Sequence, residues 1–268
     1  MTRTSLAFPD ASALLPQVEA LAREAGVVIL QIYGTAFEVR NKADASPVTQ
    51  ADEAAERLIV PALQALSPQP VVAEEAAERG ETPAVGAAFW LVDPLDGTRE
   101  FVARNGEFTV NIALIEDGRP VLGVVYLPVL DVLYAGLQGQ GAWCEAAGVR
   151  RRIQCRSSPA EGATVACSRA HGDVDLLDDW LTGQAVAGRC LAGSSLKFGL
   201  LAEGRADLYP RFGRTMEWDT AAGHAVLAAA GGSVCDLAGR TLRYGKPGFE
   251  NPHFIARGAA ASGVAPPG

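Results

Sequence analysis

The chain has 268 residues, of which 49% are hydrophobic and 20% are charged, and its formal net charge is −8. A chain of this size buries roughly 73% of its unfolded surface, which supports a full core and excludes a disordered protein or one that depends on disulfides or a structural metal. The length predicts one large domain or two closely joined halves, and the acidic charge argues against nucleic acid as a partner.

The first half predicts two amphipathic helices and then a run of strands. Apolar residues recur at helical spacing over residues 12–33 and again over 50–66, where Thr49 and Asp52 have the spacing of a capping box. Strand-like runs follow at Val71–Ala73, Phe89–Val92, Thr109–Ile115, Val121–Leu127 and Val132–Leu137. The dipeptide Asp117-Gly118 lies between two of these runs and is a hairpin signal.

The second half alternates short strands with helices. Strands are expected at 164–167, 186–191, 207–212 and 233–236, and helices at about 174–182, from Ser194 and from Asp219. A strand meander followed by this alternation predicts an α+β fold in which sheets and helices form layers. We expect an N-terminal half over residues 1–148, a C-terminal half over 149–257 and a disordered tail over 258–268. The motif Gly136-x-x-Gly139-x-Gly141 is interpreted as a hairpin turn and not as a phosphate loop.

The cysteines and the apolar runs bear on the cellular compartment. The five cysteines are widely spaced and include no Cys-x-x-Cys pair, which argues against a zinc ribbon, a thioredoxin-type site and a secreted disulfide framework. The N-terminus lacks the apolar core of a signal peptide, and no apolar run approaches the ~18 residues of a membrane span. We therefore expect a cytoplasmic protein without a transmembrane segment.

Charge is distributed unevenly along the chain. Residues 41–100 contain eleven acidic and four basic residues, whereas residues 147–214 contain seven acidic and ten basic residues. An acidic region beside a basic one is what a metal site next to an anion site requires. Ordinary variation of surface charge is the alternative explanation, and the run Arg150-Arg151-Arg152 is interpreted as surface.

The most informative segment covers residues 90–98. A buried strand is expected to end at Asp93 and to turn through a proline, so that Asp93, Asp96 and the Leu95 carbonyl converge on one point. Oxygen donors of this kind suit Mg²⁺. Gly97 and Thr98 would offer backbone N–H groups and a hydroxyl to an anion beside the metal. A turn capped by its own aspartate is the alternative.

Two further acidic positions add to this cluster. The strand at Val71–Ala73 ends in Glu74-Glu75, and two strands that end in carboxylates can place them at one sheet edge, where Glu74 is the preferred ligand. Asp219 opens a helix rich in small residues, where a plain N-cap is the alternative role. Four acids and a carbonyl without clustered histidines favour Mg²⁺ over zinc. His224, within the same helix, is interpreted as a packed core residue.

Three motifs in this order resemble the signatures of the inositol monophosphatase superfamily, whose members are Mg²⁺-dependent, lithium-sensitive phosphatases. The motifs are Glu74-Glu75, Asp93–Thr98 and the Trp-Asp-x-x-Ala-Gly sequence at 218–223. The resemblance implies a layered α-β-α-β-α sandwich of the sugar-phosphatase type. Two departures, Arg99 for the usual Lys and Ala73 for a common Ser, remove no implied ligand.

The resemblance also implies roles for individual residues. Two or three Mg²⁺ ions are expected, with five ligands: Glu74, Asp93, the Leu95 carbonyl, Asp96 and Asp219. The implied catalytic residues are Thr98, Asp52 and Glu74, where Thr98, oriented by Asp52, helps a metal-activated water to attack phosphorus. The implied substrate contacts are Glu74, Leu95, Asp96, Gly97, Thr98, His171, Ser195, Lys197, Arg211 and Asp219.

Within the superfamily, a narrower likeness to the bacterial 3′(2′),5′-bisphosphate nucleotidases rests on residues 42–52, 104–115, 193–198 and 208–212. It implies a hydrolase of sulfur metabolism that converts adenosine 3′,5′-bisphosphate to AMP and phosphate and also acts on 3′-phosphoadenosine 5′-phosphosulfate. An inositol-1-phosphate or fructose-1,6-bisphosphate phosphatase is the alternative, and a non-catalytic sensor of phosphate metabolites is a weaker one. A monomer or homodimer is expected, and relatives of this kind leave open a peripheral position at the cytoplasmic face of the inner membrane.

Overall fold

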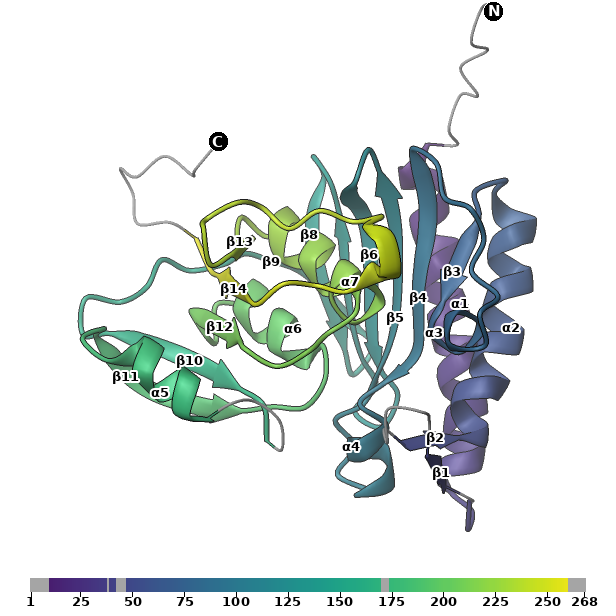
Figure 1. Ribbon diagram of the computed structural model, residues 1–268, viewed down its shortest axis with the longest axis horizontal. Helices are drawn as coiled ribbons and strands as arrows, with labels where there is room; N and C mark the ends of the chain where they lie inside the picture. Colours follow the sequence, from purple (N-terminus) through teal and green to yellow (C-terminus); the bar gives the residue numbers. More distant parts are fainter. Residues whose placement is uncertain (1–9, 38, 42–46, 170–173, 260–268) are drawn as a thin grey trace, which may run out of the picture.

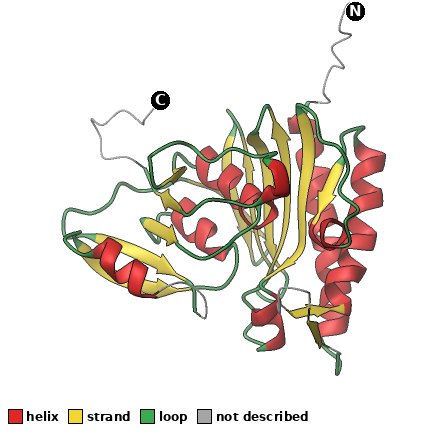
Figure 2. Cartoon of the chain, viewed as in Figure 1, coloured by secondary structure: helices red, strands yellow, loops and turns green. Residues whose placement is uncertain are grey.

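Two large β-sheets alternate with three layers of helices, and the described residues also include a two-stranded sheet (Figures 1 and 2). The computed structural model describes residues 10–37, 39–41, 47–169 and 174–259. Helices α1 and α2 form the first layer, α6 and α7 lie between the sheets, and α5 covers the outer face of the smaller sheet. This order confirms the α-β-α-β-α sandwich that the sequence predicted.

The first layer consists of α1 (Ala11–Tyr33) and α2 (Gln50–Leu66), which pack against each other and against the larger sheet. Both helices have the bounds expected from their apolar periodicity to within a residue or two. The expected capping box opens α2, because the Ala51 N–H donates to Thr49 Oγ1 and the Thr49 N–H donates to Asp52. Two short strands that we did not predict, β1 (Val39–Asn41) and β2 (Pro47–Thr49), precede it.

The larger sheet has seven strands in the order β3-β4-β5-β6-β7-β8-β9. They are β3 (Val71–Ala73), β4 (Ala88–Asp96), β5 (Thr109–Glu116), β6 (Arg119–Leu127), β7 (Val132–Leu137), β8 (Gly141–Ala146) and β9 (Val149–Ile153). Strand β3 is parallel to β4, and the others form an antiparallel meander with the predicted turns at 117–118 and after Leu137. Residue 148 lies in the turn of a β8–β9 hairpin that we did not predict, and the division into two halves stays a prediction.

The smaller sheet is mixed and has the order β11-β10-β12-β14-β13. Its strands are β10 (Ala163–Cys167), β11 (Val186–Leu191), β12 (Leu208–Arg211), β13 (Ser233–Asp236) and β14 (Phe254–Arg257). The remaining helices are α3 (Glu74–Glu78), α4 (Thr98–Val102), α5 (Val174–Leu181), α6 (Leu196–Ala202), α7 (Glu217–Ala229) and the 3₁₀ turn Pro247–Phe249. Within the segment expected to be a disordered tail, the N–H groups of Gly258 and Ala259 donate to Asp207 and Arg156, and residues 260–268 lie outside the described ranges.

Helix α7 lies against the face of the larger sheet opposite α1 and α2. Its sheet-facing side is made of small residues, and a Cβ atom at Gly123 of β6 would lie 2.4 Å from the carbonyl oxygen of Ala222. The backbone of the helix therefore approaches the sheet closely. This packing places the first turn of α7 beside the ends of β3 and β4 (Figure 1).

No described helix combines the length and the apolarity that crossing a bilayer requires. All five cysteines are free thiols, and three of them are buried.

Candidate active site

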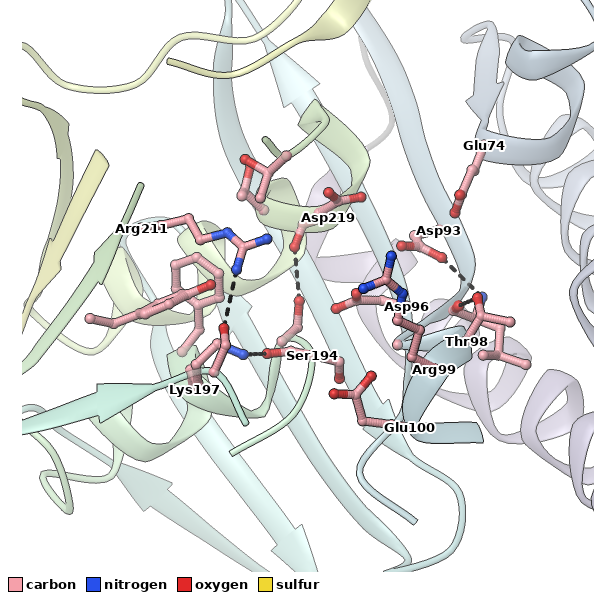
Figure 3. Close-up of a pocket in the computed structure, with 18 residues that line it drawn as sticks. Glu74, Asp93, Asp96, Thr98, Arg99, Glu100, Ser194, Lys197, Arg211 and Asp219 are labelled. Carbon is pink, nitrogen blue, oxygen red and sulfur yellow. Dashed lines mark hydrogen bonds between the residues drawn. The ribbon is translucent and has the colours of Figure 1, made fainter. Parts of the chain in front are cut away.

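A cavity of about 240 Å³ lies where the ends of β3 and β4 face α6 and α7. Residues from both sheets and from the helices between them line it (Figure 3). Of the site residues expected from the sequence, the lining includes Glu74, Asp93, Leu95, Asp96, Gly97, Thr98, Ser195, Lys197, Arg211 and Asp219. His171 lies outside the described residues. Asp52 does not line the cavity but contacts Thr98.

The first two carboxylates come from neighbouring parallel strands. Ala73 of β3 pairs with Val92 of β4, so Glu74 and Asp93 follow at the same level of the sheet. This confirms the expected convergence of two strand ends. The neighbouring Glu75 is buried, its backbone N–H donates to Glu56 Oε2, and it is not among the lining residues.

A β-bulge brings Asp96 to the same side as Asp93. Residues three apart in a regular strand point to opposite faces. In β4, however, Asp93 pairs with Asn111 and Asp96 with Thr109, so one extra residue is inserted opposite β5. The strand was expected to end at Asp93 but continues to Asp96, because the bulge accommodates a proline that cannot donate to the ladder. Leu95 is buried in the core on the other side.

Asp52 and Asp219 hold the same position in two different helices. Each is the third residue of its helix, and one carboxylate oxygen of each accepts a hydrogen bond from the backbone N–H of the N-cap residue. The donor is Thr49 for Asp52, at 2.9 Å, and Met216 for Asp219, at 2.8 Å. Asp219 is thus not the N-cap that we weighed as the alternative; Met216 occupies that position. A carboxylate has a second oxygen that this contact does not use. In Asp52 that oxygen accepts the Thr98 hydroxyl at 3.2 Å.

The first turn of α7 is held by several buried polar contacts. Glu217 is fully buried and accepts from the Lys246 ammonium at 2.6 Å and from the backbone N–H groups of Gly245 and Lys246. Asn251 donates to the Met216 carbonyl at 2.7 Å. These contacts fix the start of the helix, and therefore the carbonyl and carboxylate of Asp219, relative to the sheet.

The carboxylates of the cavity destabilise one another's charge. Burial, and after it repulsion from Glu74, Asp96 and Asp219, raises the pKa of Asp93 well above its ordinary value. Burial followed by repulsion from Asp96 and Glu74 raises the pKa of Asp219 in the same way. Among the described residues, no three or more Asp, Glu, His or Cys side chains lie close enough together to hold a metal ion as they stand. The metal-ligand assignments therefore stay predictions.

Two basic side chains face this acidic group across the cavity (Figure 3). Lys197 is buried, its ammonium donates to the carbonyls of Ala192 and Ser194, and burial lowers its pKa to about 8. Arg211 on β12 donates to Ser168 Oγ at 3.1 Å. The Ser195 hydroxyl donates to the Asp219 carbonyl and accepts from Asn111, so this side chain connects α6 to α7 and β5. The carboxylates of β3, β4 and α7 thus form an acidic side of the cavity and Lys197 and Arg211 a basic side, although a third basic residue, Arg99, lies beside Asp96 on the acidic side (Figure 3).

Comparison with known proteins agrees with this arrangement. The sequence profile of the inositol monophosphatase family matches residues 10–264. The chain belongs to the inositol monophosphatase family. It is 51% identical over 245 residues to another member of the family, the 3′(2′),5′-bisphosphate nucleotidase CysQ of Escherichia coli K12. The aligned region covers 90% of this chain and 98% of the relative.

Solved structures of the inositol monophosphatase family have the same fold. CysQ from Bacteroides thetaiotaomicron superimposes with a TM-score of 0.78 at 37% identity and covers 93% of this chain and 98% of its own. The inositol monophosphatase of Thermotoga maritima superimposes with a TM-score of 0.76 at 27% identity and covers 91% and 92%. The family assignment made from three motifs is therefore confirmed over nearly the whole chain.

The sequence did not indicate several residues that line the cavity of this family member. Ser194 adopts a positive φ of 40°, and its hydroxyl contacts Thr109 and the Glu107 carbonyl. Ser168, Tyr209 and Glu100 also line the cavity. Ser194 precedes the selected Ser195, and Ser168 lies three residues before His171 and accepts from Arg211, but side-chain direction in a turn cannot be read from spacing alone.

Proposed function

We propose that this chain hydrolyses the 3′-phosphate of adenosine 3′,5′-bisphosphate to AMP and phosphate, with Mg²⁺ as cofactor. The observation that carries the proposal is the division of one cavity into an acidic side, with Glu74, Asp93, Asp96 and Asp219, and a basic side, with Lys197 and Arg211. A substrate with two phosphates needs both sides, one for the reacting group and one for the second phosphate. The similarity to CysQ relatives that are 3′(2′),5′-bisphosphate nucleotidases supports the same activity.

The chemistry of the acidic side fits magnesium. Carboxylate and carbonyl oxygens are the ligands that Mg²⁺ prefers. Burial, and after it mutual repulsion, raises the pKa of Asp93 and Asp219, so a cation would relieve an existing cost. We infer that Glu74, Asp93, the Leu95 carbonyl, Asp96 and Asp219 hold two or three ions. When bound, magnesium would neutralise the phosphate dianion, lower the pKa of a water and stabilise the leaving oxygen.

The residues of the chain itself supply a route for the proton of the attacking water. The Thr98 hydroxyl donates to Asp52 Oδ1 at 3.2 Å, so its own proton is directed away from the cavity and its oxygen can accept one from the water. Asp52 is kept in place because its other oxygen accepts from Thr49. Attack of the water oxygen on phosphorus breaks the bond to the 3′-oxygen. The proton of the attacking water passes through Thr98 to Asp52, and the 3′-oxygen takes a proton from a solvent water and leaves as the nucleoside hydroxyl. Glu74, at the cavity wall, is the second candidate for this proton transfer.

The basic side is suited to the 5′-phosphate. An ammonium has three N–H groups, and two of those of Lys197 donate to described backbone carbonyls while the group lines the cavity, so we infer that the third meets the substrate. Arg211 presents a planar guanidinium, which recognises phosphate in a bidentate manner. Ser195, whose hydroxyl is engaged by Asn111 and Asp219, supports the site through these contacts.

Phosphate release from a substrate panel tests the proposal. Purified protein with Mg²⁺ is offered adenosine 3′,5′-bisphosphate, 3′-phosphoadenosine 5′-phosphosulfate, inositol 1-phosphate and fructose 1,6-bisphosphate, each with and without lithium. We expect the highest kcat/KM with the bisphosphate nucleotide and inhibition by lithium. The likeness to the Thermotoga maritima inositol monophosphatase makes inositol 1-phosphate the second candidate substrate. A preference for it, or for the sugar bisphosphate, would replace the nucleotide assignment. Tight binding without phosphate release would indicate a sensor.

We also infer that the protein works in the cytoplasm, as a monomer or homodimer. The free state of all five cysteines supports a reducing compartment, because disulfides form where the environment is oxidising. Light scattering on the purified protein measures the oligomeric state directly.

A further inference from the structure

Three features that the proposed activity does not use meet at a second cavity. It has a volume of about 470 Å³, and its lining includes Arg152 of the arginine run, the turn after β7 with Gly139 and Gly141, and His224 of α7. This volume is within the range of cavities that hold small molecules. None of its lining residues lines the first cavity.

The three arginines of the run at 150–152 have different surroundings. Arg150 forms an ion pair with Glu19 at 2.8 Å, and Arg151 forms one with Glu203. Arg152 forms no ion pair within the described ranges and instead donates to the Gln140 carbonyl at 2.9 Å. It also lines the second cavity. The interpretation of this run as surface therefore holds for the first two arginines, whereas the charge of Arg152 faces a cavity without a carboxylate partner.

The turn after β7 lies against that side chain. A Cβ atom at Gly141 would lie 2.6 Å from Nη2 of Arg152, so a larger residue would displace the guanidinium, which is the movable end of an exposed side chain. The glycine motif that we interpreted as a hairpin turn thus also allows the arginine to lie across the turn.

A second cation lies in the same cavity wall. Arg119 begins β6, is exposed, and lines the cavity. Its cross-strand neighbour is Glu116, yet Arg119 forms no ion pair with any residue that the structure describes. Two arginines without acidic partners give this cavity a positive potential, which attracts anions.

One wall of the cavity is small and apolar and consists of Pro120, Leu242 and the alanines 225, 228 and 229 of α7. The polar residues Gln138, Gln140 and Thr241 complete the lining. His224 contributes a neutral ring, because burial lowers its pKa to about 4 and its Nδ1 is hydrogen-bonded to the Tyr244 hydroxyl at 2.9 Å. Such a wall favours a ligand with a compact apolar body more than it favours a free inorganic ion.

We propose that this second cavity binds a compact organic anion, in which Arg119 and Arg152 hold a phosphate, phosphonate or carboxylate group while the small residues of α7 contact the apolar body. Arginine suits this role because its planar donors match the oxygens of such groups. The site is separate from the proposed hydrolysis and requires no turnover.

Calorimetric titration with phenylphosphonate tests the proposal, because its carbon–phosphorus bond cannot be hydrolysed as a phosphate ester. The full chain is titrated without Mg²⁺, and benzoate and inorganic phosphate are titrated in parallel. We expect the combined change Arg119→Ala and Arg152→Ala to weaken phenylphosphonate binding by about tenfold or more, the equivalent of one charged hydrogen bond. Benzoate is expected to bind at the same site, and inorganic phosphate to bind more weakly than phenylphosphonate.

Three variants complete the test. Arg150→Ala is the matched control, since it removes an arginine of the same strand that lies outside the cavity, and it should leave the affinity unchanged. Arg211→Ala should also leave it unchanged, since that residue belongs to the first cavity. Ala228→Leu, at an exposed helix position, fills the second cavity and should abolish binding without loss of folding. Absence of binding at about 1 mM, unchanged affinity in the double variant or in Ala228→Leu, or loss of affinity in Arg211→Ala would each overturn the proposal.

Discussion

Each oxygen of the Asp52 carboxylate has a different partner, and this difference allows its two roles to be separated. Oδ2 accepts from the Thr49 backbone at 2.9 Å and from the Thr49 hydroxyl at 2.7 Å, which is the capping contact. Oδ1 accepts from the Thr98 hydroxyl at 3.2 Å, which is the contact we assign to proton transfer. One substitution at Asp52 and one at Thr49 distinguish a structural role from a chemical one.

The change Asp52→Asn keeps the size of the side chain and one acceptor oxygen for the Thr49 N–H, but the amide cannot take up a proton. Loss of a general base typically lowers a rate by about 10²- to 10⁴-fold, and we expect kcat to fall within this range. The cap is largely kept because asparagine retains an acceptor oxygen at the buried position.

The matched control Thr49→Ala removes the hydroxyl that accepts from Ala51 and donates to Asp52 Oδ2, but leaves the main-chain bond to Asp52. Loss of a helix cap costs about 1 kcal/mol, which corresponds to a decrease of about 2–4 °C in Tm for a chain of this size. We expect kcat to stay within about a factor of three of the unsubstituted protein, because the Asp52 contact to Thr98 remains.

Steady-state phosphate release and thermal denaturation of both variants, measured side by side, provide the test. The account requires opposite outcomes: Asp52→Asn slow but nearly as stable, and Thr49→Ala less stable but active. If both variants lose kcat to the same extent, or if Asp52→Asn keeps its rate, the assignment of Asp52 as proton acceptor is refuted.

Three further predictions concern buried polar groups. Glu217→Ala leaves the Lys246 ammonium and two N–H groups without their buried acceptor, so urea denaturation should show a loss of about 3–5 kcal/mol; a loss below about 1 kcal/mol would contradict the network. Lys197→Ala should raise KM for the bisphosphate nucleotide by about 10- to 100-fold and KM for inositol 1-phosphate much less, and equal effects on both would remove the nucleotide assignment. Burial lowers the pKa of His224 to about 4, so as the pH falls this side chain is protonated in the unfolded chain before it is protonated in the folded one. The free energy of unfolding should therefore decrease between about pH 6.5 and pH 4 by more than it does in the variant His224→Gln. Identical pH profiles for the two proteins would contradict this.

Much of the fold could be predicted because local patterns agree with it. The helix at 50–66 has apolar periodicity and a capping box, and the hairpin at 117–118 has a strong turn dipeptide. Strand β9 was missed because its sequence, Val-Arg-Arg-Arg-Ile, shows no alternation; it is an edge strand with mostly exposed side chains, where burial imposes no pattern. Strand β14 was missed because only its pairing with β12 and β13 defines it.

The site could be predicted as far as chain order determines it. Two parallel strands that end in acid bring Glu74 and Asp93 together, which requires only the direction of the strands. The side on which Asp96 lies depends on a bulge, and the register of Asp219 depends on a helix whose N-cap is Met216, a residue without a capping oxygen. The second cavity was not predicted, because its arginines come from different strands and differ from their neighbours only in lacking an acidic partner among the described residues.

The central claim is that carboxylates from three separate segments hold magnesium beside the scissile phosphate. Anomalous diffraction from crystals soaked in Mn²⁺, which takes the same oxygen ligands, tests it most directly. We predict two or three peaks in the first cavity, each within about 2.5 Å of oxygens from Glu74, Asp93, Leu95, Asp96 or Asp219. An empty cavity in crystals of protein that is active with Mn²⁺, or peaks bound by other residues, would contradict the account.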